Sequence, residues 1–205
     1  MECKRKSVKD VVDNPTFTLV SQIYEKTKEY FCYGLEFNDI AIRAAFALKM
    51  QPGEIAVDFG LGQGRSTLAV AMANPYIYAF VFDIGRHDIE DVDLAIQSAT
   101  RMMAQNTPNV IFQFGDSRTI FPKWDKPVKL LSVDSHGGYD HTMQEITRWF
   151  PFVVGGGRIF IQSYNIYDNV HKDIQPAIDA YIKDKPRYKL EGLYQNTLAI
   201  DVVAS

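Results

Sequence analysis

One short string of the sequence has an acidic residue followed by three glycines, each at every second position. Such a pattern can bind a ligand. The string consists of Asp58, Gly60, Gly62 and Gly64, each separated from the next by one residue. It follows an apolar run at 54–59 that predicts a buried strand, and it precedes a stretch at 65–73 that predicts a helix. Because glycine lets the backbone approach a ligand and exposes amide groups, the string predicts a binding turn. A tight turn without a ligand is the alternative.

The glycine spacing distinguishes between two classes of binding turn. A dinucleotide fingerprint, G-x-G-x-x-G, would need glycine at one of two positions that Arg65 and Thr67 occupy. The spacing therefore argues against an oxidoreductase that uses NAD(P). That class stays the rival enzyme hypothesis, because it shares the same order of strand, loop and acidic residue.

Acidic residues also end the next three predicted strands, at Asp83, Asp116 and Asp134. Ligands of open α/β sheets bind outside the carboxyl ends of the strands, so these carboxylates are expected at one edge with the glycine turn. A carboxylate at Asp83 can accept two hydrogen bonds from a ribose diol. A helix cap is the alternative for Asp83 and for Asp116, which is followed by Ser117.

Two of the four histidines, His136 and His141, lie close to two aspartates in the sequence. Histidine titrates near neutrality, and a neighbouring aspartate can hold its ring and favour the protonated form. The string therefore predicts a general base, with His136 as the first choice, His141 as the second and Asp134 lining the site. A solvated loop histidine, or a helix cap at Asp140, is the alternative.

The same string also offers a set of metal ligands, formed by Asp134, His136, Asp140 and His141. Carboxylates and imidazoles bind divalent metals, so a metal site is an alternative to the base.

Strands and helices that must position these residues alternate along the chain. Predicted strands cover 54–59, 76–82, 110–114, 128–133, 158–162, 188–194 and 197–203, and predicted helices cover 16–33, 38–50, 65–73, 88–105, 141–150 and 168–183. This order predicts an α/β fold, a Rossmann-like three-layer sandwich whose mostly parallel seven-stranded sheet ends in a C-terminal antiparallel hairpin. Glycines 155–157 are expected to form the turn into the fifth strand. We expect a single domain over 1–205, with an N-terminal helical cap at 1–53 and a ligand-binding core at 54–205.

Through the glycine string, the chain resembles the class I methyltransferases that depend on S-adenosylmethionine (SAM). Their first motif is an acidic residue followed by G-x-G-x-G at the end of the first strand, and the resemblance covers about 54 to 203, including the hairpin. It implies SAM as the cofactor. The implied contacts are Asp58, Gly60, Gly62 and Gly64 at the methionyl end, Asp83 at the ribose, and Asp116 with Ser117 at the adenine.

The histidine string resembles a segment of the small-molecule O-methyltransferases within that class. The matching residues are Asp134, His136 and Tyr139, although the acid and the histidine are one residue closer here. This resemblance implies methyl transfer to a hydroxyl of a small molecule, a sugar or a secondary metabolite, with Tyr139 in the acceptor site. The variable N-terminal cap of the family implies that Tyr33 and its aromatic neighbours close over the acceptor. A non-catalytic module that binds SAM is a third hypothesis.

The catechol-type relatives within this class bind a metal through acids at the ends of the fourth and fifth strands, with an Asp-Asn pair at the fifth. Residues 162–165 are Gln-Ser-Tyr-Asn instead, so we predict no metal.

Composition narrows the choice of partners. The chain has 22 Lys+Arg against 25 Asp+Glu, a net charge of −3, so no nucleic-acid partner is expected. The longest apolar run, 76–82, is too short to span a bilayer, so no membrane is expected. Two cysteines, Cys3 and Cys32, and a charged start without a signal sequence favour a cytoplasmic location. Apolar surface on the N-terminal helices or the edge hairpin would allow a homodimer.

Overall fold

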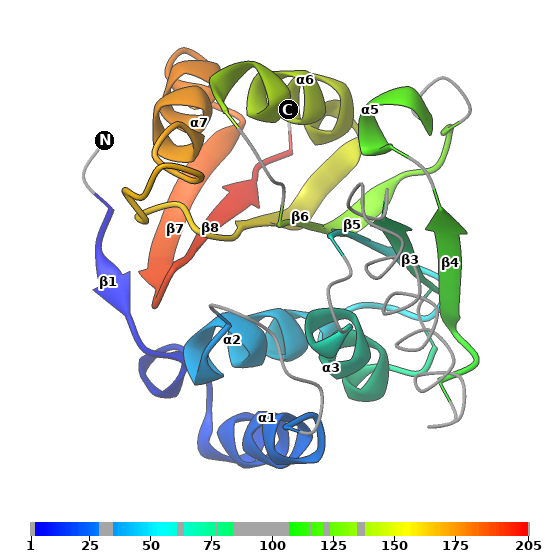
Figure 1. Ribbon diagram of the computed structural model, residues 1–205. Coiled ribbons are helices and arrows are strands. Elements are labelled where there is room, and N and C mark those ends of the chain that lie inside the picture. The colour runs from blue at the N-terminus through cyan, green and yellow to red at the C-terminus, as the bar shows by residue number, and fades with distance from the viewer. Residues whose placement is uncertain are drawn as a thin grey trace.

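A twisted sheet with helices on both faces forms the molecule (Figure 1). This computed structural model describes residues 3–28, 35–60, 64–76, 78–83, 107–114, 116–120, 124–134 and 138–204. In Figure 1, α1, α2 and α3 cover one face, and α5, α6 and α7 cover the other. The three-layer α/β sandwich expected from the sequence is therefore confirmed.

The sheet of the described residues has eight strands, in the order β1-β7-β8-β6-β5-β2-β3-β4. Their bounds are β1 Arg5–Lys6, β2 Ile55–Phe59, β3 Tyr78–Asp83, β4 Val110–Phe114, β5 Val128–Val133, β6 Val153–Ile161, β7 Tyr188–Tyr194 and β8 Thr197–Val202. Only β8 is antiparallel to its neighbours, β6 and β7. The expected number of seven strands is wrong. The additional strand, β1, has two basic residues and pairs parallel with β7, and it is too short to show an alternating pattern.

The described helices are α1 Asn14–Lys26, α2 Phe37–Ala47, α3 Arg65–Ala73, α5 Ser117–Ile120, α6 Tyr139–Trp149 and α7 Ile174–Ile182, with 3₁₀ turns at Val8–Asp10 and Phe150–Phe152. α1 begins earlier than expected because the Asp13 side chain accepts a hydrogen bond from the Thr16 amide at 2.8 Å. α7 begins later than expected, which places Pro176 in its first turn. Backbone amides in the first turn have no partner within the helix, so the amide hydrogen that proline lacks is not needed there. The helix expected at 88–105 lies outside the described residues. None of the described helices has the length and apolar character needed to cross a membrane.

Glycines 155–157 belong to β6 and do not form the separate turn that was expected. The pairing of β5 with β6 shifts register between Val128 and Leu130. A Cβ atom on Gly157 would lie 2.8 Å from the main-chain oxygens of Lys129 and Val154. Glycine is therefore required here because the irregular strand brings two backbones together.

The residues of β2 alternate between the two faces of the sheet. Val57 and Phe59 join the core under α6 and α7, where the Phe59 ring meets the Trp149 ring edge-on at 4.8 Å. Ala56 joins the core under α1, α2 and α3. Because side chains alternate along a strand, Asp58 faces α3 as well. β2 lies between β3 on one side and β5 on the other, so the strand order reverses at β2. Open α/β sheets bind their ligands at such a reversal point.

Candidate functional site

The glycine turn at the end of β2 lies directly against the end of β5. Gly60 has a φ of +80°, and a Cβ atom there would lie 2.5 Å from the main-chain oxygen of Asp134. The Asp134 amide also donates a hydrogen bond to the Phe59 oxygen at 3.1 Å. Gly64 has a φ of +79° and precedes the first residue of α3, while Gly62 lies outside the described residues. The turn therefore needs glycine both for its backbone conformation and for its close approach to β5.

Asp58 is a buried carboxylate with only one of its oxygens engaged. Its Oδ2 accepts a hydrogen bond from the Thr67 hydroxyl of α3 at 2.7 Å. Its Oδ1 is buried and has no hydrogen-bond partner. Burial raises the pKa of Asp58, while the Thr67 hydrogen bond and the charge of Arg43 lower it. A buried carboxylate oxygen without a partner is costly, so its position beside the glycine turn suits a ligand that donates hydrogen bonds.

Arg65, the first residue of α3, is a buried cation with unused donors. Its side chain is only 7% exposed, and its guanidinium lies 4.2 Å from the centre of the Tyr24 ring on α1. The Nε and Nη2 atoms have no hydrogen-bond partner. In the sequence, Arg65 was considered only as a break in a dinucleotide fingerprint. No local pattern could show that α1 would bury its guanidinium.

Asp134 has an unusual environment at the end of β5. Its pKa is raised to about 7, chiefly by burial and also by the neighbouring Asp58, against the lowering effect of the charge of Arg43. The pKa of this carboxyl group therefore lies well above the usual range of an aspartate. The structure therefore places two acidic groups, Asp58 and Asp134, next to one another at the point where strand order reverses.

The stability of the protein should depend on pH through Asp134. Because the folded state keeps the proton of Asp134 up to about pH 7 and the unfolded state loses it near pH 4, stability should fall as pH rises between these values. We expect the loss of melting temperature between about pH 5 and about pH 8 to be smaller in Asp134→Asn than in the unchanged protein. It should not vanish, since burial also raises the pKa of Asp39 and Asp58. Thermal unfolding at both pH values measures the difference, and equal losses in the two proteins would contradict the assignment.

Arg43, on α2, lies fully buried beneath these two carboxylates. Its guanidinium donates to the Ser132 hydroxyl at 3.2 Å, to the Thr197 hydroxyl at 3.2 Å and to the Gln162 side-chain oxygen at 3.1 Å. It also donates to the main-chain oxygen of Asp39. Arg43 therefore connects α2 with β5, with β8 and with Gln162, the residue that follows β6, and its positive charge acts on Asp58 and Asp134. Sequence reasoning missed it, because an arginine in an Ala-rich helix gives no sign of burial.

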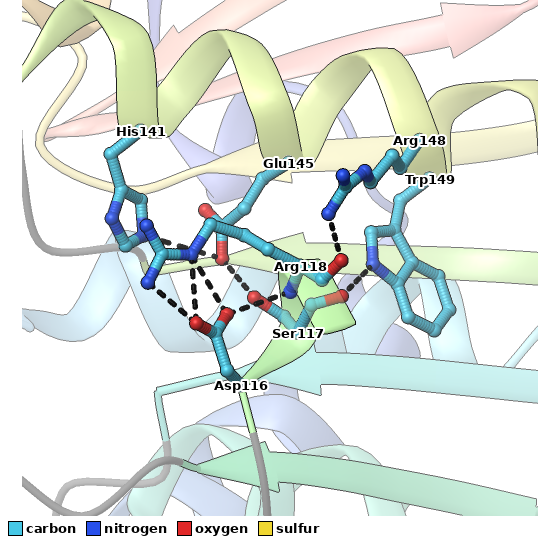
Figure 2. A network of polar contacts seen from close by, with 7 residues as sticks. All are labelled: Asp116, Ser117, Arg118, His141, Glu145, Arg148 and Trp149. Atoms are coloured by element: carbon cyan, nitrogen blue, oxygen red, sulfur yellow. Dashed lines mark hydrogen bonds and ion pairs between the residues drawn. The ribbon is translucent and has the colours of Figure 1, made fainter. Parts of the chain in front are cut away.

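Asp116 and Ser117 occupy the carboxyl end of β4 (Figure 2). Asp116 accepts from the Arg118 amide at 2.8 Å and from the Arg118 Nε atom at 2.8 and 2.9 Å. The side-chain hydrogen bond from Arg118 lowers the pKa of Asp116, which therefore stays ionised. Asp116 thus caps the first turn of α5, as the alternative interpretation allowed, and it lies at the edge expected to hold the ligand.

His141 lies in this second cluster, which α6 holds together (Figure 2). The Ser117 hydroxyl donates to Glu145, and the Trp149 ring nitrogen donates to the Ser117 main-chain oxygen at 2.8 Å. His141 Nε2 lies 3.7 Å from the Glu145 Oε1 atom, one helical turn away. The structure therefore brings His141 together with Asp116 and Ser117. His136, the first choice for the base, lies outside the described residues.

Of the remaining predicted site residues, some lie within the described ranges and one does not. Tyr139 begins α6 and is 41% exposed, and its contact with the acceptor stays a prediction. Asp83 ends β3, where it pairs with Phe114 of β4. Tyr33 lies outside the described residues. Within the described ranges, no group of three or more His, Cys, Asp or Glu side chains could hold a metal ion.

Other proteins of known structure share this fold. No protein-family model and no curated protein matches the sequence. An rRNA methylase from Streptococcus thermophilus is 15% identical, with a TM-score of 0.59 over 80% of this chain and 96% of that one. The O-methyltransferase NovP is 15% identical, with a TM-score of 0.59 over 90% and 79% of the two chains. A Streptococcus mutans protein in complex with S-adenosylhomocysteine (SAH) is 15% identical, with a TM-score of 0.58 over 79% of this chain and 95% of that one. At these identities the likeness shows a shared fold alone.

Proposed function

We propose that this protein is a SAM-dependent methyltransferase that acts on a hydroxyl of a small molecule. The observation that carries the proposal is the glycine turn at the reversal of strand order, with the unpartnered Oδ1 of Asp58 buried beside it. A Cβ atom at Gly60 would collide with the main-chain oxygen of Asp134, so only glycine lets the turn pack against the end of β5. The fold neighbours, which include methylases and a complex with SAH, support the same cofactor.

The residues present fit the chemical groups of SAM. Asp58 would accept hydrogen bonds from its ammonium group, and the unused donors of Arg65 would bind its carboxylate. Asp83 would accept from the ribose hydroxyls, and Asp116 with Ser117 would lie at the adenine. SAM supplies a methyl group on a sulfonium, already activated for displacement. The protein then needs to orient the acceptor hydroxyl and remove its proton.

Two observations favour a small acceptor over RNA. The net charge of −3 gives no surface excess of cations for a phosphate backbone. The acceptor side of the site exposes Tyr139, whose ring can stack on a small cyclic molecule. Because the fold neighbours include both an rRNA methylase and an O-methyltransferase, the experiment must compare the two acceptor classes directly.

Calorimetric titration with SAM and SAH tests the cofactor. We expect one site per chain and a large loss of affinity in Asp83→Ala, since the ribose would lose its acceptor. NADH serves as the competing ligand, and saturable NADH binding without SAH binding would support the rival oxidoreductase. Radiolabelled SAM offered with separate small-molecule and RNA fractions then identifies the acceptor class. Label only in RNA would overturn the small-molecule proposal, and SAH binding without any transfer would support the non-catalytic module.

Arg65 should distinguish the two ends of the cofactor. In Arg65→Met, we expect SAH affinity to fall roughly 10- to 100-fold, because a charge-assisted hydrogen bond to the carboxylate is lost. Affinity for 5′-methylthioadenosine, which lacks the amino-acid end, should not change. Calorimetry with both ligands makes the comparison, and Arg65→Lys, which keeps the charge, should give a smaller loss. Equal losses for the two ligands would show that Arg65 only supports the fold.

A further inference from the structure

We propose that Tyr24 on α1 positions the Arg65 guanidinium for the cofactor carboxylate, so that the N-terminal cap forms part of the cofactor site. This inference rests on the methyltransferase function proposed above, in which Arg65 binds that carboxylate. It gives the cap a role at the amino-acid end of the cofactor, whereas the resemblance implied only that Tyr33 and its neighbours close over the acceptor. Three observations carry it: the burial of Arg65 with unused donors, its contact with the Tyr24 ring, and the packing that fixes this ring.

Arg65 is a buried cation at the N-terminus of α3, the end of a helix where positive charge is unfavourable. Its Nε and Nη2 atoms are buried without a hydrogen-bond partner, and so is the hydroxyl of the next residue, Ser66. Across the part of the chain that the structure describes, no ion pair includes Arg65. Unused donors and positive charge at one helix end fit an anion that accepts hydrogen bonds, such as a carboxylate.

The Tyr24 ring holds the guanidinium without using its donors. The Cζ atom of Arg65 lies over this ring, 4.2 Å from its centre, well within the range of a cation–π contact. The ring attracts the cation through its π-electrons and accepts none of the N–H groups that a carboxylate needs. An acidic partner would occupy those groups and cancel the charge. The Lys28 ammonium also lies over the ring, but it is farther away, at 5.8 Å, and it pairs with Glu25 at 2.6 Å.

Packing within the N-terminal cap fixes the Tyr24 ring. The ring meets the ring of Phe37, the first residue of α2, edge-on at 5.1 Å. Phe17 meets the same Phe37 ring edge-on at 5.8 Å. Phe17 and Tyr24 are seven residues apart, about two turns of α1, so both face α2. Figure 1 shows α1 below α2 and α3, on the side away from the sheet. The three rings therefore set where the face of Tyr24 lies relative to α3.

Tyr24 acts through Arg65 and is therefore a positioning residue. Without the ring, the guanidinium would keep its charge and its donors, but binding would have to order a long side chain that the ring now holds in place. Ordering a flexible side chain on binding weakens affinity. The loss should therefore appear for ligands that carry the carboxylate, and it should not appear for ligands that lack it.

Calorimetric titration of Tyr24→Leu and Tyr24→Phe with SAH tests the inference. We expect Tyr24→Leu to weaken SAH binding roughly 3- to 30-fold, the range that one cation–π contact supports. Tyr24→Phe keeps a ring face over Arg65, so its SAH affinity should stay within about 2-fold of that of the unchanged protein. Affinity for 5′-methylthioadenosine, which lacks the amino-acid end, should not change in either variant.

Two further variants separate positioning from packing. Phe17→Leu removes a ring of the same cluster but leaves the contact of Tyr24 with Arg65, so it should lower stability and bind SAH as the unchanged protein does. In the Arg65→Met background, Tyr24→Leu should cause no further loss of SAH affinity, because the ring acts only through the guanidinium. All titrations are made at a temperature where thermal unfolding shows each variant to be folded.

The outcomes distinguish this inference from the proposed function. SAH binding by the unchanged protein with undiminished affinity in Tyr24→Leu would overturn the role of Tyr24 and leave the function standing. Equal losses in Tyr24→Leu and Tyr24→Phe, equal losses in Tyr24→Leu and Phe17→Leu, or an additive loss in the double variant would also overturn it. Absence of SAH binding in the unchanged protein would overturn the proposed function and the role of Tyr24 together.

Discussion

Replacing Arg43 with methionine should lower the free energy of unfolding by about 3 to 5 kcal/mol, the usual cost of removing one partner from a buried charged network. Methionine fills much of the same volume but supplies no donors. Four oxygens would then lose a hydrogen bond: one each on α2, β5 and β8, and one on Gln162, just after β6. The buried Asp39 would also lose the cation that now lowers its pKa.

A double-mutant cycle with Asp39→Asn separates these contributions. The Asp39 carboxylate accepts from the Asn196 amide at 3.0 Å and from the Thr197 hydroxyl at 2.8 Å, and asparagine can keep an oxygen in that place. The double variant should therefore be more stable than the sum of the two single losses predicts, because no uncompensated charge remains. Denaturant unfolding of the four proteins measures the coupling. A loss below about 1 kcal/mol in Arg43→Met would show that the network does not stabilise the fold.

Arg43→Met should also change the pKa values in the proposed cofactor site. Arg43 lowers the pKa of both Asp58 and Asp134, so its loss should raise both further. At neutral pH, Asp58 would then carry less negative charge for a ligand ammonium. The residue that joins the helical cap to the sheet therefore also sets the charge of the proposed cofactor site, which links stability to function through one guanidinium.

The sequence predicted those parts of the fold that depend on local chemistry. The bounds of α3, β4, β5 and β7 agree with the structure, because apolar runs between glycine, proline and acidic residues define them. β1 could not be predicted, since two basic residues form a strand only when β7 offers a partner. The bulge in β6 was also hidden, because glycines in a strand and glycines in a turn look the same along a sequence.

The residues of the candidate site also differ in whether the local sequence indicates them. The glycine turn and the acidic strand ends are visible in sequence because neighbouring residues define them. Arg43 and Arg65 are not, because their partners are distant in sequence and meet them only through burial. The pair of His141 with Glu145 gave a weak signal in its spacing of one helical turn.

Gly60→Ala should abolish cofactor binding, and Gly53→Ala provides a matched control. Both glycines have similar positive φ values, +80° at Gly60 and +84° at Gly53. An added Cβ has nothing within 4 Å at Gly53 but lies 2.5 Å from the Asp134 oxygen at Gly60. Gly53→Ala should therefore cost only the left-handed strain, about 1 to 2 kcal/mol of unfolding free energy. Gly60→Ala should cost about 1 to 3 kcal/mol more, because the end of β5 must move.

SAH affinity distinguishes the two variants more sharply than stability does. We expect Gly60→Ala to lose at least about 100-fold in affinity, since the turn cannot keep both its approach to β5 and its open backbone. Gly53→Ala lies before β2 and should bind SAH as the unchanged protein does. Calorimetry at a temperature where both variants remain folded makes the comparison. Full SAH affinity in a folded Gly60→Ala protein would show that the ligand does not approach this turn, and the strongest support for the methyltransferase function would be lost.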